Sequence, residues 1–81
     1  MIARFQNTTV FIEVKTRWGK SYGLPEESIT PFKLRALIKT AHYYMMLHQN
    51  LPQSLRVDVV AVEMDGSGVA TAIRHFENVT G

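Results

Sequence analysis

The sequence predicts an α/β domain in which a mixed β-sheet packs against one long helix. Two segments rich in β-branched and aromatic residues precede a stretch with helical periodicity, and two more follow it. The expected order is strand, strand, helix, strand, strand, a layout in which sheet and helix bury a shared core. A chain of 81 residues has room for one domain, which we expect to span residues 1–81.

The first two predicted strands form a hairpin. Residues 1–5 are mostly apolar, and residues 9–16 are rich in β-branched residues, with apolar and polar positions alternating after Phe11. The polar break at residues 6–8 is short enough for a tight turn between antiparallel strands.

Residues 17–28 are predicted to form a loop, which glycines and a proline punctuate. A loop of about a dozen residues is long for a small domain, and such loops often carry function. Cations that meet phosphates and rings that stack on bases would suit a nucleic-acid strand. A solvated loop with Trp18 folded under the domain explains the pattern equally well. The basic and aromatic residues concerned are Arg17, Trp18, Lys20 and Tyr22.

The predicted helix begins at Thr30 and Pro31, a hydroxyl N-cap followed by proline in the first helical position. We expect it to end near Asn50, before Leu51 and Pro52. Apolar and aromatic positions recur at the spacing of one buried face, and Met45 and Met46 are expected to pack in or near the core. The face comprises Leu34, Leu37, Ile38, Ala41, Tyr44, Met45 and His48.

The last two predicted strands follow this helix. Residues 55–64 contain a nearly continuous valine run, which favours a strand covered on both faces. Residues 65–68 have the composition of a turn, and residues 69–76 form the returning strand.

Composition limits the class of protein. The 9 Lys and Arg residues against 7 Asp and Glu residues give a net charge of +2, a mild bias towards anionic partners. The absence of cysteine excludes a disulfide framework and a Cys-based zinc site. No apolar run is long enough to span a membrane, and no signal-peptide pattern opens the sequence. We therefore expect a cytoplasmic protein without membrane contact.

Glu13 and Lys15 are the residues best suited to chemistry. Positions two apart on a strand share a face, with Cα atoms about 6.5–7 Å apart. We expect Val10, Ile12 and Val14 on the opposite face, packed on the core. A carboxylate suits Mg²⁺, and a neighbouring ammonium group can orient an attacking water or offset charge on a pentacovalent phosphate. A same-face ion pair without catalytic function explains the same two residues.

The other polar candidates favour structural roles. Glu26 and Glu27 fit acids placed near a helix N-terminus better than metal ligands. Arg56 and Asp58 share a strand face and are expected to pair with each other. The histidines lack metal-like spacing and are expected at the surface or the core edge; they are His42, His48 and His75.

Several segments together resemble one known family, the YraN-like predicted endonucleases. Residues 11–17 (FIEVKTR) are similar to its "FVEVKTR" strand, and residues 22–33 to its "fGsPeesvtprK" loop and helix start. Residues 56–62 (RVDVVAV) match "RfDvvaV", and residues 73–79 match "IrHi.NAf". Ala41, Tyr44 and Met45 match its "A..YL". The resemblance covers nearly the whole chain, in order.

The resemblance implies a restriction-endonuclease-like fold of the PD-(D/E)xK superfamily, related to Holliday junction resolvases. It implies Mg²⁺- or Mn²⁺-dependent cleavage of DNA, with branched DNA as one candidate substrate. Glu13 and the Val14 carbonyl would be metal ligands, Glu13 and Lys15 the catalytic residues. Arg17, Lys20 and Lys33 would contact the nucleic acid.

One departure concerns the beginning of the chain. Residues 1–4 (MIAR) resemble the "LIAR" that follows "GEID" in the family, so the family's opening helix, first strand and acidic pair are expected to be missing. The resemblance implies a lost metal-ligand aspartate and impaired cleavage. An expressed fragment, a misassigned start codon and a naturally truncated inactive member are all compatible with this pattern.

An exposed first strand also predicts association, because unpaired strand edges recruit other chains. We expect a homo-oligomer formed through this N-terminal edge strand or through exposed helix surface. Two further hypotheses stand beside the nuclease: a non-catalytic nucleic-acid-binding module that keeps the fold, and a protein-interaction module without a nucleic-acid role.

Overall fold

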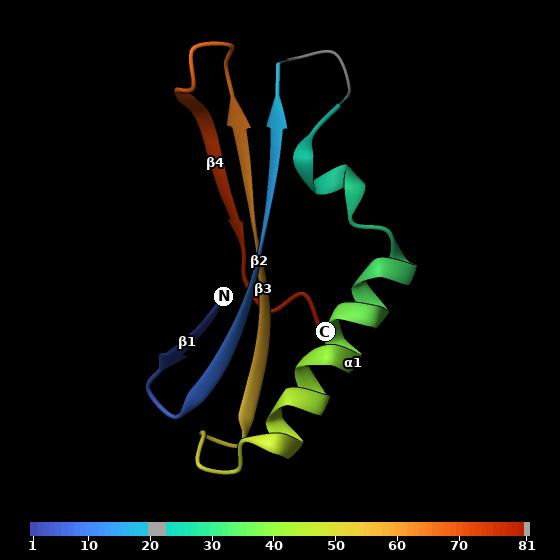
Figure 1. The fold of residues 1–81 in the computed structure, drawn as a ribbon, viewed down its shortest axis with the longest axis vertical. Coiled ribbons are helices and arrows are strands. Elements are labelled where there is room, and N and C mark those ends of the chain that lie inside the picture. Colours follow the sequence, from blue (N-terminus) through green and yellow to red (C-terminus); the bar gives the residue numbers. More distant parts are fainter. Residues whose placement is uncertain (20–22, 81) are drawn as a thin grey trace.

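A computed structural model describes residues 1–19 and 23–80 as a single four-stranded sheet with one long helix against it (Figure 1). The predicted α/β class and the order strand, strand, helix, strand, strand are confirmed, with a short 3₁₀ helix, η1, added before the long helix. The elements are β1 (Ile2–Phe5), β2 (Thr8–Trp18), η1 (Pro25–Ser28), α1 (Pro31–Leu47), β3 (Ser54–Met64) and β4 (Ala70–Phe76).

The sheet is mixed, and its spatial order β1-β2-β3-β4 follows the sequence. β1 pairs antiparallel with β2, and β4 pairs antiparallel with β3. The central strands β2 and β3 are parallel from Thr8 opposite Ser54 to Trp18 opposite Met64. Parallel neighbours need a crossover connection, and α1 supplies it.

β1 is much shorter than its partner β2. Ile2 lies opposite Phe11, and the backbones of Met1 and Ile12 exchange two hydrogen bonds, at 2.8 and 3.2 Å. Within the described chain no residue of β1 lies opposite residues 13–18. The second half of β2 is therefore an open sheet edge on this side, although β3 covers its other side.

The start of α1 follows the predicted signals. The Thr30 hydroxyl accepts a hydrogen bond from the Lys33 amide at 3.2 Å, and Pro31 is the first helical residue. The helix ends at Leu47, three residues earlier than predicted. No helix in the described residues is long and apolar enough to cross a membrane.

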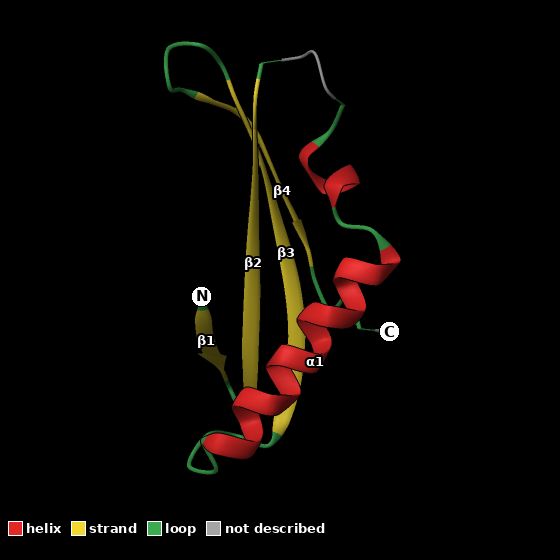
Figure 2. Ribbon diagram, turned by 45° about the vertical axis from the view of Figure 1, so that its right-hand side comes forward, coloured by secondary structure: helices red, strands yellow, loops and turns green. Residues whose placement is uncertain are grey.

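The core lies on the face of the sheet that α1 covers, and this is the face of Phe11 (Figure 2). The predicted arrangement, with Val10, Ile12 and Val14 turned to the helix-covered core, is wrong. Val10 is buried on the opposite face, but Val14 is 46% exposed. The side chains of Phe11, Ala41, Met45 and Val57 form the central cluster.

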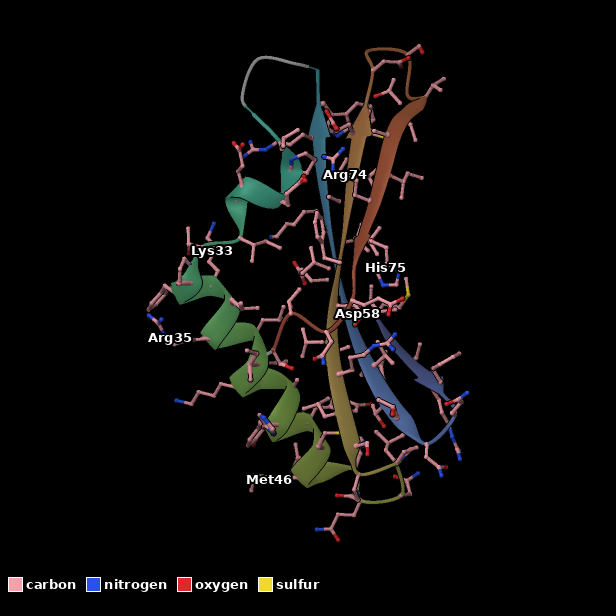
Figure 3. The ribbon with its side chains drawn as sticks, turned by 180° about the vertical axis from the view of Figure 1, so that it is seen from behind. Lys33, Arg35, Met46, Asp58, Arg74 and His75 are labelled. Atoms are coloured by element: carbon pink, nitrogen blue, oxygen red, sulfur yellow. The ribbon has the colours of Figure 1, made fainter. Side chains whose placement is uncertain are left out.

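The valines and the alanine of β3 are buried more deeply on the side of α1 than on the opposite side. Val57, Val59 and Ala61 are buried towards α1, whereas Val60 and Val62 on the opposite face stay half-buried. The prediction of a strand covered on both faces is therefore only half right. Met46 is also a correction, because its side chain is 70% exposed and points away from the sheet (Figure 3).

Candidate active site

Glu13 and Lys15 project from β2 on the face that α1 covers. The Glu13 Oε1 and Lys15 Nζ atoms are 3.2 Å apart, and the two side chains are 37% and 35% exposed. Ion pairs at this level of exposure stabilise a protein by well under ~1 kcal/mol, so a ligand can separate them at low cost. The two groups are together and accessible; their catalytic roles remain predictions.

A hollow of about 210 Å³ opens beside this pair, between β2 and the start of α1. Lys33, from the first turn of α1, brings a second ammonium group to the hollow, and Phe32 lines it as well. The sequence did not single out Phe32, since an apolar residue in the first turn of a helix carries no signal of its own. The remaining lining residues are Ile29, Ala36 and Leu37.

The backbone of Val14 faces the open edge of the sheet. Hydrogen-bonded positions alternate along a strand, and Ile12 directs both its amide and its carbonyl to β1. Val14, two positions further, directs its carbonyl to the same side, where no described strand pairs with it. A carbonyl oxygen is thus available next to the Glu13 carboxylate.

This donor set has the chemistry of a weak site for a hard cation. Mg²⁺ takes oxygen ligands, is held by one or two carboxylates and keeps several waters. Glu13 and the Val14 carbonyl fit that pattern with the minimum of protein ligands. The described residues hold no group of three or more His, Asp or Glu side chains placed around one ion.

The basic and aromatic residues predicted as one cluster lie on two faces. Arg17 follows Lys15 by two positions and shares its face, so it continues the positive charge along β2, although it does not line the hollow. Trp18 lies on the opposite face and is 60% exposed, so it is neither tucked under the domain nor part of this site. Lys20 and Tyr22 lie outside the described residues.

Glu26 has a partner that the sequence did not reveal. The Arg74 guanidinium on β4 donates from Nε and Nη2 to the two Glu26 carboxylate oxygens, both at 2.7 Å, and from Nη1 to Glu63 at 2.6 Å. The hydrogen bonds from Arg74 lower the pKa of the Glu26 carboxyl. Glu26 therefore ties η1 to the sheet. Its main contact is Arg74, not the helix N-terminus near which we expected it.

Asp58 is fully buried on the sheet face opposite α1. The predicted pair with Arg56 is confirmed, with Nε and Nη2 each 2.9 Å from a carboxylate oxygen. His75 Nε2 lies 2.8 Å away and the Asn78 amide donates at 2.9 Å (Figure 3). Burial alone raises the pKa of Asp58, but the hydrogen bonds from Arg56, Asn78 and His75 hold it below its usual value.

The histidines lie at the surface or near it, as predicted. His75 is 46% exposed and contacts Asp58, while the His48 ring stacks on Tyr44 with centroids 4.0 Å apart. His42 is exposed on α1. His42 and His48 belong to α1 and its C-terminal cap, whereas His75 lies on β4, and they form no group of potential metal ligands within the described residues.

Comparison with known proteins places this arrangement in a family. The model of the Uncharacterised protein family UPF0102 matches residues 1–62. The chain belongs to the UPF0102 family. This family is the YraN-like family to which the sequence motifs pointed.

Several UPF0102 relatives match over most of the chain. A protein of Geobacter sulfurreducens is 38% identical over 78 residues, 96% of this chain and 60% of the relative. One of Beutenbergia cavernae is 37% identical over 79 residues, 98% of this chain and 66% of the relative. One of Leifsonia xyli is 45% identical over 62 residues, which are 76% of this chain and 52% of the relative. This UPF0102 chain thus spans roughly three fifths of the length of its first two relatives.

Proposed function

We propose that this chain carries the Glu-x-Lys half of a metal-dependent DNA endonuclease site of the PD-(D/E)xK type. It acts in the cytoplasm on DNA, with branched DNA as one candidate substrate. The observation that supports the proposal is the joint exposure of Glu13 and Lys15 in the hollow that Lys33 also lines. A carboxylate, two ammonium groups and a free carbonyl in one place suit a phosphodiester better than a neutral substrate.

Each residue has a distinct task in this proposal. Glu13 and the Val14 carbonyl would hold Mg²⁺ or Mn²⁺, and the bound ion would supply activation of a water and stabilisation of charge on the phosphate. Lys15 leaves Glu13 and donates hydrogen bonds to the attacking water or to a non-bridging phosphate oxygen. Arg17 and Lys33 neutralise the neighbouring phosphates of the strand, and Lys20, outside the described residues, is the third proposed phosphate contact.

The register of the hairpin supports a second carboxylate in longer members of the family. Met1 pairs with Ile12, so an antiparallel strand continued by one residue places that residue opposite Glu13, on its face. In the family pattern the residue at this place is the aspartate of "GEID". Directly opposed residues have Cβ atoms about 4.5–5.5 Å apart, which allows both carboxylates to share one ion.

For this chain we propose weak or absent cleavage, because its own residues offer one carboxylate. A non-catalytic DNA-binding module with the nuclease fold is the alternative that the Glu13–Lys15 ion pair favours, since the carboxylate is already compensated. That module binds DNA in a salt-sensitive way, keeps binding after Glu13→Ala and loses it when Arg17 or Lys20 is neutralised.

We also propose that the chain forms a homo-oligomer. All four residues of β1 are exposed, and its outer edge pairs with no strand in the described part of the chain. Ile73 is 66% exposed on the sheet face opposite α1, beside half-buried Val62, and adds apolar surface to the contact. A protein-interaction module would use the same surfaces.

The test is nicking of supercoiled DNA with Mg²⁺ or Mn²⁺. Purified chain is expected to cleave at or near background, whereas the full-length Geobacter sulfurreducens relative cleaves in a metal-dependent way. Glu77→Gln, which changes an exposed carboxylate just after the end of β4, is the matched control for Glu13→Gln. Robust nicking by this chain that depends on Glu13 and Lys15 would show that one carboxylate suffices; a metal-independent or inactive relative would overturn the nuclease proposal.

A further inference from the structure

Two hollows adjoin Phe32 at the start of α1. One is the hollow of Glu13 and Lys15, and the other, of about 280 Å³, is lined by Phe32, Arg35, Ala36 and Lys39. Phe32 lines both and is 72% exposed. A single exposed phenylalanine is ordinary on a protein surface, so its exposure alone indicates nothing. The informative feature is its position, because Phe32 lies between the Glu13 and Lys15 hollow and the cations of α1.

The cations of α1 lack acidic partners. No acidic residue occurs between Glu27 and Asp58 in the sequence, and within the described residues neither Lys33, Arg35 nor Lys39 pairs with a carboxylate. Figure 3 shows Lys33 and Arg35 at the N-terminal end of the helix, with Arg35 pointing away from the sheet. The helix surface is therefore positively charged and complementary to a polyanion.

These cations follow one line along the helix. Phe32, Arg35 and Lys39 lie at positions i, i+3 and i+7, which share a face, and the rise from Arg35 to Lys39 is about 6 Å. Lys33 lies beside Phe32 on the side of the Glu13 hollow. A strand that passes along this face would meet an aromatic ring and three positive charges before it reaches Glu13 and Lys15.

We propose that Phe32 is a stacking platform for one unpaired base, with Lys33, Arg35 and Lys39 on the phosphates beside it. The substrate class is then DNA with a single-stranded or unpaired nucleotide next to the reacting phosphate. A base within a continuous duplex is stacked on both sides and cannot cover the ring. This inference rests on the proposed function, because it names the DNA structure that the same site receives.

The test is equilibrium binding without metal, so that it does not depend on cleavage. Fluorescence anisotropy compares an oligo-dT strand with a duplex of equal length at low salt, for wild type, Phe32→Ala and Phe32→Tyr. Removal of a stacking ring weakens single-strand binding by about tenfold, Phe32→Tyr restores it, and duplex binding changes less than about twofold. Lys39→Ala lowers the slope of log K against log salt by about 1.

Phe5→Ala is the matched control, because Phe5 is a 57% exposed ring on the opposite sheet face. Equal single-strand affinity for wild type and Phe32→Ala overturns the inference, as does equal weakening of strand and duplex, or the same loss in Phe5→Ala. Absence of any DNA binding at low salt also overturns it. If single-strand binding depends on Phe32 but the full-length relative does not cleave DNA, only the nuclease proposal is refuted. If the relative cleaves DNA but Phe32→Ala leaves single-strand binding unchanged, only the stacking platform is refuted.

Discussion

Removal of the Asp58 carboxylate is expected to destabilise the domain more than any surface change. Asp58 receives two hydrogen bonds from Arg56, one from the Asn78 amide and one contact from His75, at 2.8–2.9 Å, without exposure to solvent. It therefore joins β3 to β4 and to the turn that follows β4. Asp58→Ala leaves the Asn78 amide and the Arg56 guanidinium without their acceptor.

The size of the effect follows from this count of partners. Breaking a buried, hydrogen-bonded charge pair costs about 3–5 kcal/mol. Asp58→Asn costs roughly half of that, since the remaining oxygen keeps the Asn78 amide and Arg56 Nε as donors, while the new NH₂ group opposes Arg56 Nη2. A domain of this length has about 4–12 kcal/mol in total, so Asp58→Ala removes a large share of its stability.

Thermal and urea unfolding followed by circular dichroism measure these differences. Four kcal/mol corresponds to a fall in Tm of about 16–32 °C for a domain of this size. Glu77→Gln, an exposed carboxylate two residues after His75, is the control and is expected to stay within about 0.5 kcal/mol of wild type. An Asp58→Ala protein as stable as this control would refute the account of Asp58 as the tie between β3 and β4.

Three further predictions concern the pH dependence of Asp58, the Arg74 contact and the edge of β1. The pKa of Asp58 lies below its unfolded value of about 3.9, so the stability that Asp58 contributes is complete at neutral pH and is lost as the pH falls through the folded-state pKa. Urea unfolding at pH 7 and pH 3 is expected to show a larger fall in the free energy of unfolding for wild type than for Asp58→Asn. Arg74→Ala frees η1 from the sheet, and limited proteolysis is expected to cut near Glu26 faster, without the same change in Arg35→Ala. Arg4→Pro removes a backbone amide of β1 that faces away from β2, so we expect sedimentation velocity to show a monomer for this variant and an oligomer for Arg4→Ala. A wild-type protein that is monomeric at high micromolar concentration would contradict self-association.

Local signals in the sequence were enough for the elements and their order. The start of α1 at Thr30 and Pro31 is encoded by a cap that acts within one turn, and the hairpin by a polar break between two β-rich segments. The pairing of Arg56 with Asp58 also needs only strand periodicity. Such features depend on neighbours in the chain and are therefore accessible without tertiary contacts.

Contacts between distant segments decided what the sequence left open. Alternation along β2 separates Phe11 from Val10 correctly, but it does not say which face the helix will cover. The buried row of Val57, Val59 and Ala61 on β3 aligns with Phe11, and α1 packs there. Likewise, Arg74 meets Glu26 across 48 residues of chain, a pairing that no local pattern contains.

The candidate site was predicted in part for the same reason. Glu13 and Lys15 share a face because strand geometry requires it, and the lining of their hollow by Lys33 follows from where α1 begins. The open edge beside Val14 depends on where β1 stops pairing with β2, and the exposure of Phe32 depends on how the helix leaves η1. Both became visible only once the strands and the helix were placed together.

The affinity for Mn²⁺ of a chain extended at its amino end by Gly-Glu-Ile-Asp tests the central claim most directly. Electron paramagnetic resonance counts free Mn²⁺ in titrations of the chain, the extended chain and the extended Glu13→Gln variant. The account predicts that the extension tightens binding about tenfold or more, about 1.4 kcal/mol, and that Glu13→Gln abolishes the gain. Equal affinity of the extended chain and its Glu13→Gln variant would contradict a metal site at Glu13.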